Sequence, residues 1–226
     1  YRQSERGGFY EEAAKRLLEA GLAYEAGDEV GRSALYFRPP ARSGIFRDAL
    51  RGGIRFSNIE DFVIRKSDGT PAYNFAAVVD DAAMDISHVI RGEEHLPNTA
   101  RQALICRALE EKEPEFVHLG LILGPDGKKL SKRHGAESIA EYRREGYLPE
   151  ALLNYLALLG WSHPEGTEEF ADLDELVREW DPLRLGASPA AFDLERLLFV
   201  NARRIRRLPP GELYKRLVLF LEEPLP

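Results

Sequence analysis

The sequence contains a single cysteine and a single methionine, and it has no long hydrophobic run. The lone Cys106 excludes an internal disulfide and favours a reducing compartment, so we expect a cytoplasmic protein. No apolar stretch approaches the roughly 20 residues that a membrane-spanning helix needs, and we expect no membrane association. The first residues form no signal peptide and include no initiator methionine. We therefore expect the chain to begin partway through a longer gene product.

The overall charge is acidic, since 31 lysines and arginines stand against 38 aspartates and glutamates, for a formal net charge of -7 at pH 7. This balance argues against a protein that coats nucleic acid, although a local basic patch remains compatible with it. With 226 residues, 44% of them hydrophobic, the chain can bury one large core or two small ones.

Hydrophobic periodicity predicts helices and strands in the first two thirds of the chain. Residues 7–21 keep helical spacing and end at a glycine. A predicted strand at 88–94 is followed by an amphipathic helix at 97–111 and by a continuously apolar, buried strand at 115–123. Strand, helix and strand in this order predict a βαβ unit in a parallel sheet. Further strands are predicted at 34–37, 53–57, 61–67 and 73–79.

The pattern becomes helical after residue 135. Residues 148–161 predict a helix that is apolar on nearly every face and therefore buried on most sides. Residues 192–208 predict an amphipathic helix with three arginines, Arg203, Arg206 and Arg207, opposite its apolar side. That apolar side would carry Leu194, Leu197, Leu198, Ile205 and Leu208.

A basic loop follows the predicted buried strand. Its sequence, GPDGKKLSKRHG at 124–135, gathers five cationic or titratable side chains around Ser131, namely Lys128, Lys129, Lys132, Arg133 and His134. Ligands of open α/β sheets bind beyond the carboxyl ends of the strands. Lysines placed there can hold phosphate oxygens and neutralise the charge that develops as pyrophosphate leaves. Taken alone, however, the loop fits a solvated basic turn better.

The surrounding segments change that interpretation. In their order along the chain, YRQSER, KSDGTPAYNFAAVVDD, HVIRGEEHLPNTARQ, FVHLGLILGPDGKKLSKRHGA and FDLERLLFVNARRIRRLPP resemble segments of the class I glutamyl-tRNA synthetases. The resemblance covers most of residues 1–24 and 35–215, and KLSKR is similar to that family's form of the class I signature loop. It implies ATP-dependent activation of glutamate, normally with Mg²⁺, and transfer to tRNA(Glu), catalysed by positioning and electrostatics.

The resemblance also implies the site residues. Five residues match the ATP loop: Lys129, Leu130, Ser131, Lys132 and Arg133. Among them Lys132 is the catalytic candidate, since it is expected to touch the phosphates most directly. Glu94 and Ile122 match positions that line the adenosine site.

Tyr73 and Arg91 match the positions that hold the amino-acid substrate. A guanidinium suits this task because it grips a carboxylate bidentately. From the residues alone, the favoured interpretation of Arg91 is an ordinary ion pair with Glu93 or Glu94. The helix at 192–208 would lie along the inner side of the tRNA, which makes Arg203, Arg206 and Arg207 candidate phosphate contacts.

The implied fold is α/β, with an incomplete class I nucleotide-binding (Rossmann-like) parallel sheet followed by an all-helical stem-contact domain. Residues 1–24 would be a helix from the first half of the catalytic domain, and 25–60 a shortened inserted segment that binds the acceptor arm. Residues 61–135 would be the second half of the catalytic domain, and 136–226 the helical domain with the start of the anticodon-binding region. The family's amino-terminal half, with its His-x-Gly-His signature, has no counterpart here, so we expect the chain alone to be inactive.

No metal site is expected, because the cysteine-rich zinc site of some family members is missing. We expect a monomer. Two alternative functions remain open: a related synthetase that glutamylates a modified tRNA base, and a truncated paralogue that binds RNA without catalysis. Glutaminyl-tRNA synthetase is disfavoured, because its bacterial members carry a different signature loop.

Four further residues invite functional interpretations that we do not favour. Cys106 is expected to be a small apolar filler of its helix. His118 lies in the apolar strand and needs no ligand to account for it. Asp80 and Asp81 are expected to diverge in extended chain and to serve as a cap or turn rather than as a catalytic pair.

Overall fold

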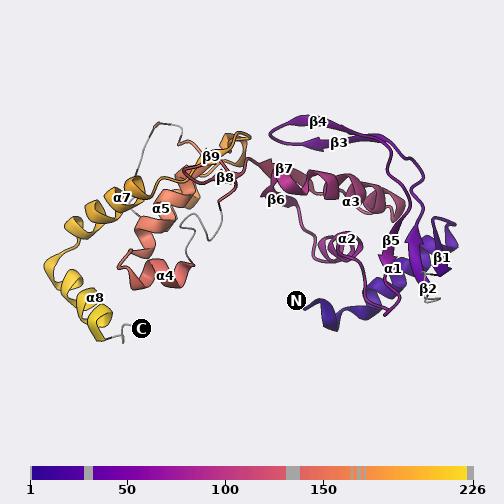
Figure 1. Ribbon diagram of the computed structural model, residues 1–226, viewed down its shortest axis with the longest axis horizontal. Coiled ribbons are helices and arrows are strands. Elements are labelled where there is room, and N and C mark those ends of the chain that lie inside the picture. The colour runs from indigo at the N-terminus through magenta and orange to yellow at the C-terminus, as the bar shows by residue number, and fades with distance from the viewer. Residues whose placement is uncertain are drawn as a thin grey trace. The chain divides into compact units, whose positions relative to one another are not determined.

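The computed structural model describes residues 2–27, 33–130, 138–163, 165–166, 169–170 and 172–222. The chain forms two compact units, residues 1–118 and residues 119–226 (Figure 1). The second unit thus begins before the basic loop. Within the described ranges, no helix is both long enough and apolar enough to cross a bilayer.

The first unit begins with the short 3-10 helix η1 (Gln3–Glu5) and the helix α1 (Gly7–Glu19), which lies where the sequence predicts it. An antiparallel sheet follows, in the order β1 (Ala23–Gly27), β2 (Ser33–Phe37) and β5 (Phe62–Arg65). The buried face of α1 packs against Leu35, Phe37 and Ile64 of this sheet, all of which are fully buried. The predicted strands at 34–37 and 61–67 are confirmed.

A second sheet has the strand order β4 (Gly52–Phe56), β3 (Gly44–Asp48), β7 (Glu115–Leu119) and β6 (His88–Gly92). Strands β6 and β7 are neighbours joined by the 3-10 helix η2 (Glu93–His95) and the helix α3 (Leu96–Ala108), so the predicted strand–helix–strand unit is present. The prediction of a parallel sheet is only partly right. Strand β3 pairs in parallel with β7, but it pairs antiparallel with β4.

The predicted strand at 73–79 is wrong, because these residues form the first turns of the helix α2 (Tyr73–Ala83). Phe75, Ala76, Val78 and Val79 are buried at helical spacing in the core shared with α1 and α3. Burying each larger side chain contributes about 1.5–3 kcal/mol. The β propensity of two valines is a weaker effect, since the whole scale spans about 1 kcal/mol. The tertiary packing therefore decides the conformation.

The predicted strand at 115–123 is interrupted. After β7 the chain resumes as β8 (Ile122–Leu123), which pairs in parallel with β9 (Ala190–Ala191). At the interruption, the backbone of Ser188 and Pro189 approaches Gly120 so closely that a Cβ atom there would collide with it. Glycine is thus the residue that allows these two backbone segments to meet.

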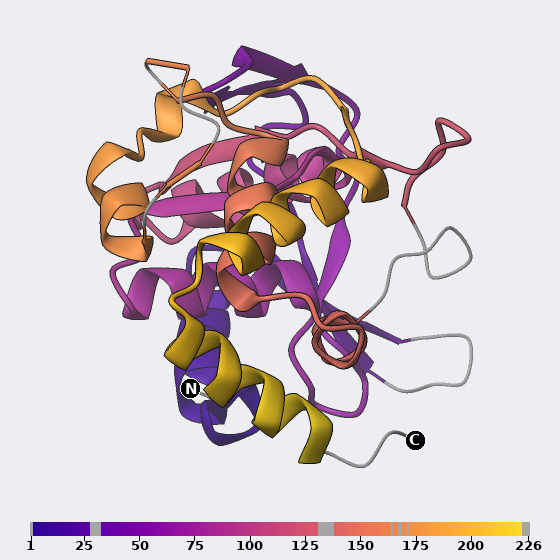
Figure 2. The ribbon, with the colours of Figure 1, turned by 90° about the vertical axis from the view of Figure 1, so that its left-hand side faces the viewer.

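The rest of the second unit is mainly helical. Its described helices are α4 (Ile139–Arg144), α5 (Pro149–Leu159), α6 (Leu173–Glu179), η4 (Pro182–Arg184), α7 (Leu194–Arg207) and α8 (Pro210–Glu222). A capping box between Ser138 and Glu141 starts α4, and the Asp193 carboxylate caps α7 by accepting from the Arg196 amide. Helices α5 and α7 pack side by side, and the chain bends before Pro209 to enter α8 (Figure 2).

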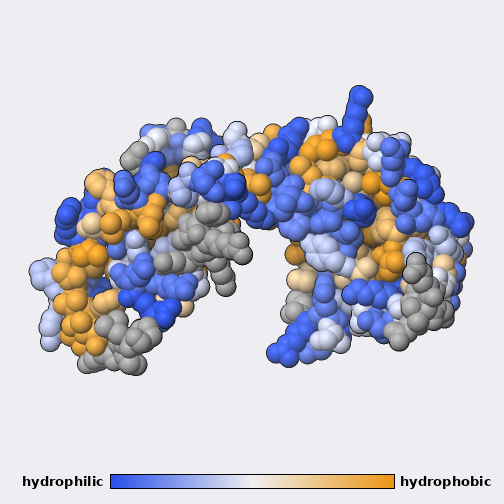
Figure 3. Space-filling model, viewed as in Figure 1, coloured by the Kyte–Doolittle hydropathy of each residue, from blue (hydrophilic) through white to orange (hydrophobic). Residues whose placement is uncertain are grey.

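Two predictions about the faces of these helices need correction. Leu194 and Leu198 are 50% and 56% exposed, whereas α7 is buried at Leu197, Val200 and Asn201. Helix α5 is buried along one face and not on most sides, since Leu153 and Leu156 are exposed. Hydrophobic residues also gather at the surface over α8 (Figure 3), among them Leu213, Leu217 and Leu221.

Candidate active site

A fully buried acid–histidine pair lies at the centre of the second sheet. The Asp48 side chain, at the end of β3, accepts the Leu50 and Arg51 amides on Oδ1, at 3.0 and 2.9 Å. Its Oδ2 accepts the His118 amide at 3.0 Å and lies 2.7 Å from His118 Nδ1. Both side chains are inaccessible to solvent. Three backbone amides that donate to one carboxylate fit its ionised form.

Arg91, on β6, reaches this pair through neutral groups. Its Nε donates to His118 Nε2 at 3.3 Å, and its Nη2 donates to Thr99 Oγ1 at 2.6 Å and to Gln102 Oε1 at 2.7 Å. The expected alternative, an ion pair with Glu93 or Glu94, does not occur, and Glu93 instead pairs with Arg51 at 2.6 Å. Among the described residues, Arg91 forms no salt bridge at all. A half-buried guanidinium with neutral partners retains its attraction for an anion.

Tyr73 lies next to Arg91, so the structure brings the two predicted amino-acid ligands together. Burial lowers the pKa of Arg91, while electrostatic interactions with Tyr73 and with the nearby Asp81 carboxylate oppose that shift. Tyr73 is the first residue of α2, and 55% of its surface is exposed. Burial raises the pKa of Asp81, and the Arg91 charge counteracts it. The arrangement is a cationic group beside a solvent-accessible phenol.

The two predicted adenosine residues belong to different units. Glu94 lies in η2 and is exposed, and its carboxylate folds back over Gly92. Ile122, in β8 of the second unit, is 39% exposed.

The start of the predicted ATP loop is a hairpin. The Leu130 amide donates to the Ile122 carbonyl and the Gly124 amide to the Lys128 carbonyl, both at 2.8 Å. Gly127 turns the chain with a φ of 72°, which favours glycine. Lys128 and Lys129 are consequently held on an exposed turn. Ser131, Lys132 and Arg133 lie outside the described residues.

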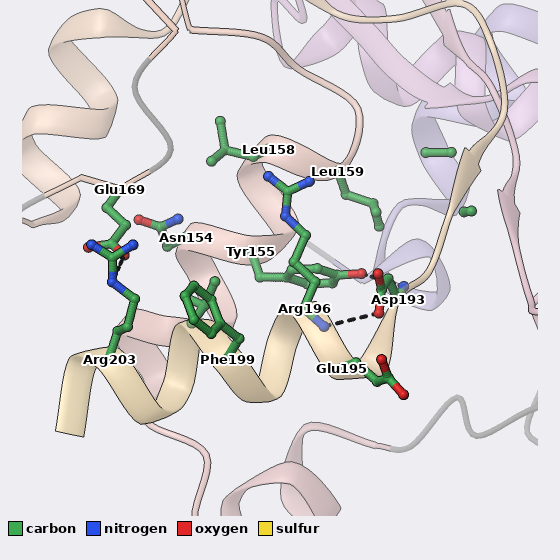
Figure 4. A pocket seen from close by; sticks show the side chains of 13 residues that line it. Asn154, Tyr155, Leu158, Leu159, Glu169, Asp193, Glu195, Arg196, Phe199 and Arg203 are labelled. Carbon is green, nitrogen blue, oxygen red and sulfur yellow. Dashed lines mark hydrogen bonds and ion pairs between the residues drawn. The ribbon is translucent and has the colours of Figure 1, made fainter. Parts of the chain in front are cut away.

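The arginines of α7 differ from one another. Arg203 Nε lies 2.9 Å from a Glu169 oxygen, and Arg207 also pairs with Glu169, whose side chain is only 13% exposed. Figure 4 shows Arg203 turned toward Glu169 beside a hollow of about 710 Å³ that Phe199 and Arg196 also line. Arg206 is exposed. Arg203 and Arg207 thus share a carboxylate partner within the second unit, whereas Arg206 forms no ion pair among the described residues.

Several remaining side chains have structural surroundings. Cys106 is buried as expected, and burial raises the pKa of its thiol to about 11. Asp80 lies inside α2, where it accepts from Arg6 at 2.6 Å and from Tyr10 at 2.9 Å, so the expected cap or turn role is wrong. Among the described residues, no group of three or more histidine, cysteine, aspartate or glutamate side chains is arranged to hold a metal ion.

The partners of Arg91 are not evident from the sequence. Thr99 and Gln102 lie on α3, whose predicted amphipathic pattern draws attention to its apolar positions. His118 reads as a strand residue that needs no ligand, and Asp48 falls in a stretch without clear periodicity. One signal is available: a histidine inside a buried apolar strand needs polar partners.

Comparisons with known proteins agree with one another. Residues 25–199 match the family described as tRNA synthetases class I (E and Q), catalytic domain. Glutamate–tRNA ligase 1 of Rubrobacter xylanophilus is 72% identical over 226 residues, covering 100% of this chain and 52% of that protein. Glutamate–tRNA ligase of Aquifex aeolicus is 42% identical over 265 aligned positions, covering 99% of this chain and 56% of that protein.

A solved structure is also similar. The glutamate tRNA ligase from Elizabethkingia meningosepticum, crystallised in complex with its amino acid, has a TM-score of 0.88 and 29% identity, over 100% of this chain and 59% of that one. The chain thus spans about half the length of the curated relatives that it matches. The alignment with the Aquifex protein has more positions than this chain has residues, so that protein carries segments without a counterpart here.

Proposed function

We propose that this chain, which belongs to the class I tRNA synthetases (E and Q), supplies part of the catalytic domain of a glutamate–tRNA ligase. The relatives named above carry that name, and the chain matches about half of each. The activity, substrates and partners of the whole protein are therefore inferences from the family and from the site.

The proposed reaction has two steps. In the first, a glutamate carboxylate oxygen attacks the α-phosphorus of ATP, and pyrophosphate leaves from a glutamyl adenylate. In the second, a hydroxyl of the terminal tRNA ribose attacks the glutamyl carbonyl, and AMP leaves. Both steps are accelerated by positioning and by charge stabilisation, and neither needs a covalent enzyme intermediate.

The observation that carries the proposal is the environment of Arg91. Its guanidinium is half-buried, has neutral hydrogen-bond partners and stands beside the Tyr73 hydroxyl. Such a group binds a carboxylate strongly, because burial weakens competition from water while no carboxylate among the described residues forms a salt bridge with it. We assign Arg91 and Tyr73 to the amino-acid substrate. A neutral substrate would leave the guanidinium uncompensated, which selects for an acidic one.

We assign ATP to the segment that starts with the 122–130 hairpin. Lys129 and Leu130 open the KLSKR sequence, and Ser131, Lys132 and Arg133 complete it. The hairpin's hydrogen bonds support the role by fixing where this sequence leaves β8. Glu94 and Ile122 are assigned to the adenosine. Magnesium would enter with ATP, bound mainly by the phosphates.

The same family membership supports proposals about the tRNA substrate, the oligomeric state and the cellular location. The acceptor would be tRNA(Glu), contacted at its phosphates by the α7 arginines, with Arg206 the most available of them. We propose a monomer in the cytoplasm. The segments that the Aquifex relative has in addition are consistent with a shortened acceptor-arm insertion at 25–60.

The test uses the full-length protein that contains this chain. It should catalyse glutamate-dependent exchange between ATP and pyrophosphate and should charge tRNA(Glu), with glutamine as the negative control. The 226-residue chain alone should catalyse no exchange. A full-length protein that binds tRNA but neither exchanges pyrophosphate nor glutamylates any RNA would instead be a non-catalytic paralogue.

A further inference from the structure

Four side chains of the first unit form a hydrogen-bonded chain from a cation to an anion. The sequence of contacts runs from Arg91 Nη2 to Thr99 Oγ1 (2.6 Å), to His118 Nε2 (2.8 Å), and from His118 Nδ1 to Asp48 Oδ2 (2.7 Å). Thr99 and His118 are fully buried, as is the Asp48 side chain. In such surroundings every polar hydrogen needs an acceptor.

The direction of each hydrogen bond follows from its two ends. Arg91 can only donate, and the ionised Asp48 can only accept. The hydrogen on His118 must therefore be on Nδ1, directed at Asp48, which leaves a lone pair on Nε2. The Thr99 hydroxyl lies 2.8 Å from Nε2 and 3.2 Å from the His95 carbonyl oxygen, the two acceptors for its one hydrogen, and it accepts from Arg91 Nη2. The Arg91 Nε–H, at 3.3 Å, points at the same nitrogen.

We propose that the Asp48–His118 pair is a positioning device for Arg91, which fixes the plane of the guanidinium by holding His118 in its Nδ1–H tautomer. This proposal rests on the assignment of Arg91 to the amino-acid substrate and extends it to residues that do not touch the substrate. The Asp48 carboxylate is linked to Arg91 only through the neutral side chains of His118 and Thr99 and does not contact the guanidinium. The position at which a carboxylate of the protein could contact the guanidinium directly therefore remains available to the carboxylate of the substrate.

The geometry of Arg91 shows what this arrangement achieves. Nε and both hydrogens of Nη2 are directed at acceptors from α3 and β7, namely Thr99, Gln102 and His118. The Gln102 amide is oriented in turn, because its Nε2 donates to Asn74 Oδ1 at 3.2 Å. Tyr73 interacts electrostatically with the same guanidinium. A guanidinium held at three points loses less entropy when a carboxylate binds.

The device requires a neutral His118. Protonation would place a hydrogen on Nε2, which would face the Arg91 Nε–H and the Thr99 hydroxyl. The charged groups around the ring are Asp48, Arg91 and Arg51, and the apolar neighbours are Phe46 and Phe116. Burial lowers the pKa of His118; the Asp48 hydrogen bond opposes this shift, and the two arginines reinforce it. The neutral form is therefore the one present near pH 7.

The first experiment observes the tautomer directly. Nitrogen-15 NMR of the 226-residue chain at pH 7 should show His118 as the neutral Nδ1–H tautomer. This measurement does not depend on the substrate. An Nε2–H tautomer, or a charged ring, would overturn the proposal even if the protein is a glutamate–tRNA ligase.

The second experiment measures glutamate and ATP KM in the full-length protein. His118→Leu removes the acceptor and should raise the glutamate KM by roughly 10- to 100-fold, the equivalent of one hydrogen bond to a charged group, with the ATP KM unchanged. His118→Gln should restore most of the loss, because its amide oxygen can accept from Arg91 without a tautomer to be fixed. His88→Leu is the matched control, since His88 is exposed on the strand of Arg91 and pairs with Glu115.

The remaining outcomes distinguish the positioning role of Asp48 and His118 from the binding of glutamate by Arg91. If Arg91→Gln impairs glutamate use but His118→Leu and Asp48→Asn do not, Arg91 binds substrate and the positioning role is wrong. If wild-type protein binds no glutamate, the proposed function fails and the tautomer measurement alone decides on the network. If His118→Leu does not fold, His118→Gln and Asp48→Asn replace it, with Asp48→Asn expected to raise the glutamate KM by favouring the opposite tautomer.

Discussion

Arg91 in the first unit and Arg203 in the second are both partly buried arginines, but their partners differ in charge. Arg91 donates to a threonine, a glutamine and a histidine. Arg203 lies 2.9 Å from the Glu169 carboxylate, which Arg207 also contacts. A carboxylate partner satisfies the charge of an arginine inside the protein, whereas neutral partners fix its position and leave the charge for a ligand. The comparison teaches that the partners of an arginine, more than its exposure, indicate its role.

The most demanding test of this comparison is Arg91→Gln in the full-length protein. The substitution keeps hydrogen-bonding capacity but removes the charge, so kcat/KM for glutamate should fall by roughly 10²- to 10³-fold, the scale of truncating one partner of a desolvated charge pair. The KM for ATP should change little. Arg107→Gln is the matched control, because Arg107 already has a carboxylate partner, Glu113, at 2.6 Å. Equal losses for glutamate and ATP would make Arg91 a structural residue.

In contrast to the half-buried Arg91, Lys128 and Lys129 are exposed on the turn of the 122–130 hairpin. This hairpin leads into the KLSKR sequence. Lys132→Ala should lower the rate of glutamate activation by roughly 10²-fold, the scale of losing one contact made in the transition state. Glutamate binding should hardly change. Pre-steady-state formation of the adenylate, measured at saturating glutamate, separates the two effects. A result in which the glutamate KM carries the loss would contradict the assignment of Lys132 to phosphate.

Several elements of both units are predictable from the sequence, but the network around Arg91 is not. The strand–helix–strand order of β6, α3 and β7 follows from periodicity, because local patterns encode local elements. The helix α2 escapes prediction because its valines favour a strand in isolation, and the packing against α1 and α3 that overrides them is not local. The resemblance to known synthetases indicates Tyr73 and Arg91. The contact between Asp48 and His118 joins strands far apart in sequence, and no periodicity reveals it.

A substitution of Glu169 tests the other half of the comparison, namely the arginines that have a carboxylate partner. Glu169→Gln removes the shared partner of Arg203 and Arg207, and should lower the free energy of unfolding by about 1–2 kcal/mol, since the carboxylate is mostly buried while both arginines are partly solvated. Urea denaturation of the 226-residue chain measures it. Glu195→Gln, at an exposed position of α7, should change stability by less than about 0.5 kcal/mol. Equal effects would mean that the Glu169 cluster is no stronger than a surface pair.

Arg206 allows the finest test, because it shares a helix with Arg203 and Arg207 but not their acidic partner. It is exposed, and within the described part of the chain it forms no ion pair. A phosphate that approaches α7 must compete with Glu169 for Arg203 and Arg207, whereas Arg206 gives up only water. If α7 contacts tRNA, Arg206→Gln in the full-length protein should reduce the slope of log affinity against log salt by about one.

The same substitution at Arg203 or Arg207 should change the salt dependence less and the stability more. Arg178→Gln, at an exposed position of α6, controls for the loss of any surface charge. tRNA affinity measured by filter binding between low and moderate salt gives the slopes for all four variants. A slope that Arg206→Gln leaves unchanged would assign this arginine to the solvent, and it would show that a cation without an acidic partner is not by itself a sign of a ligand.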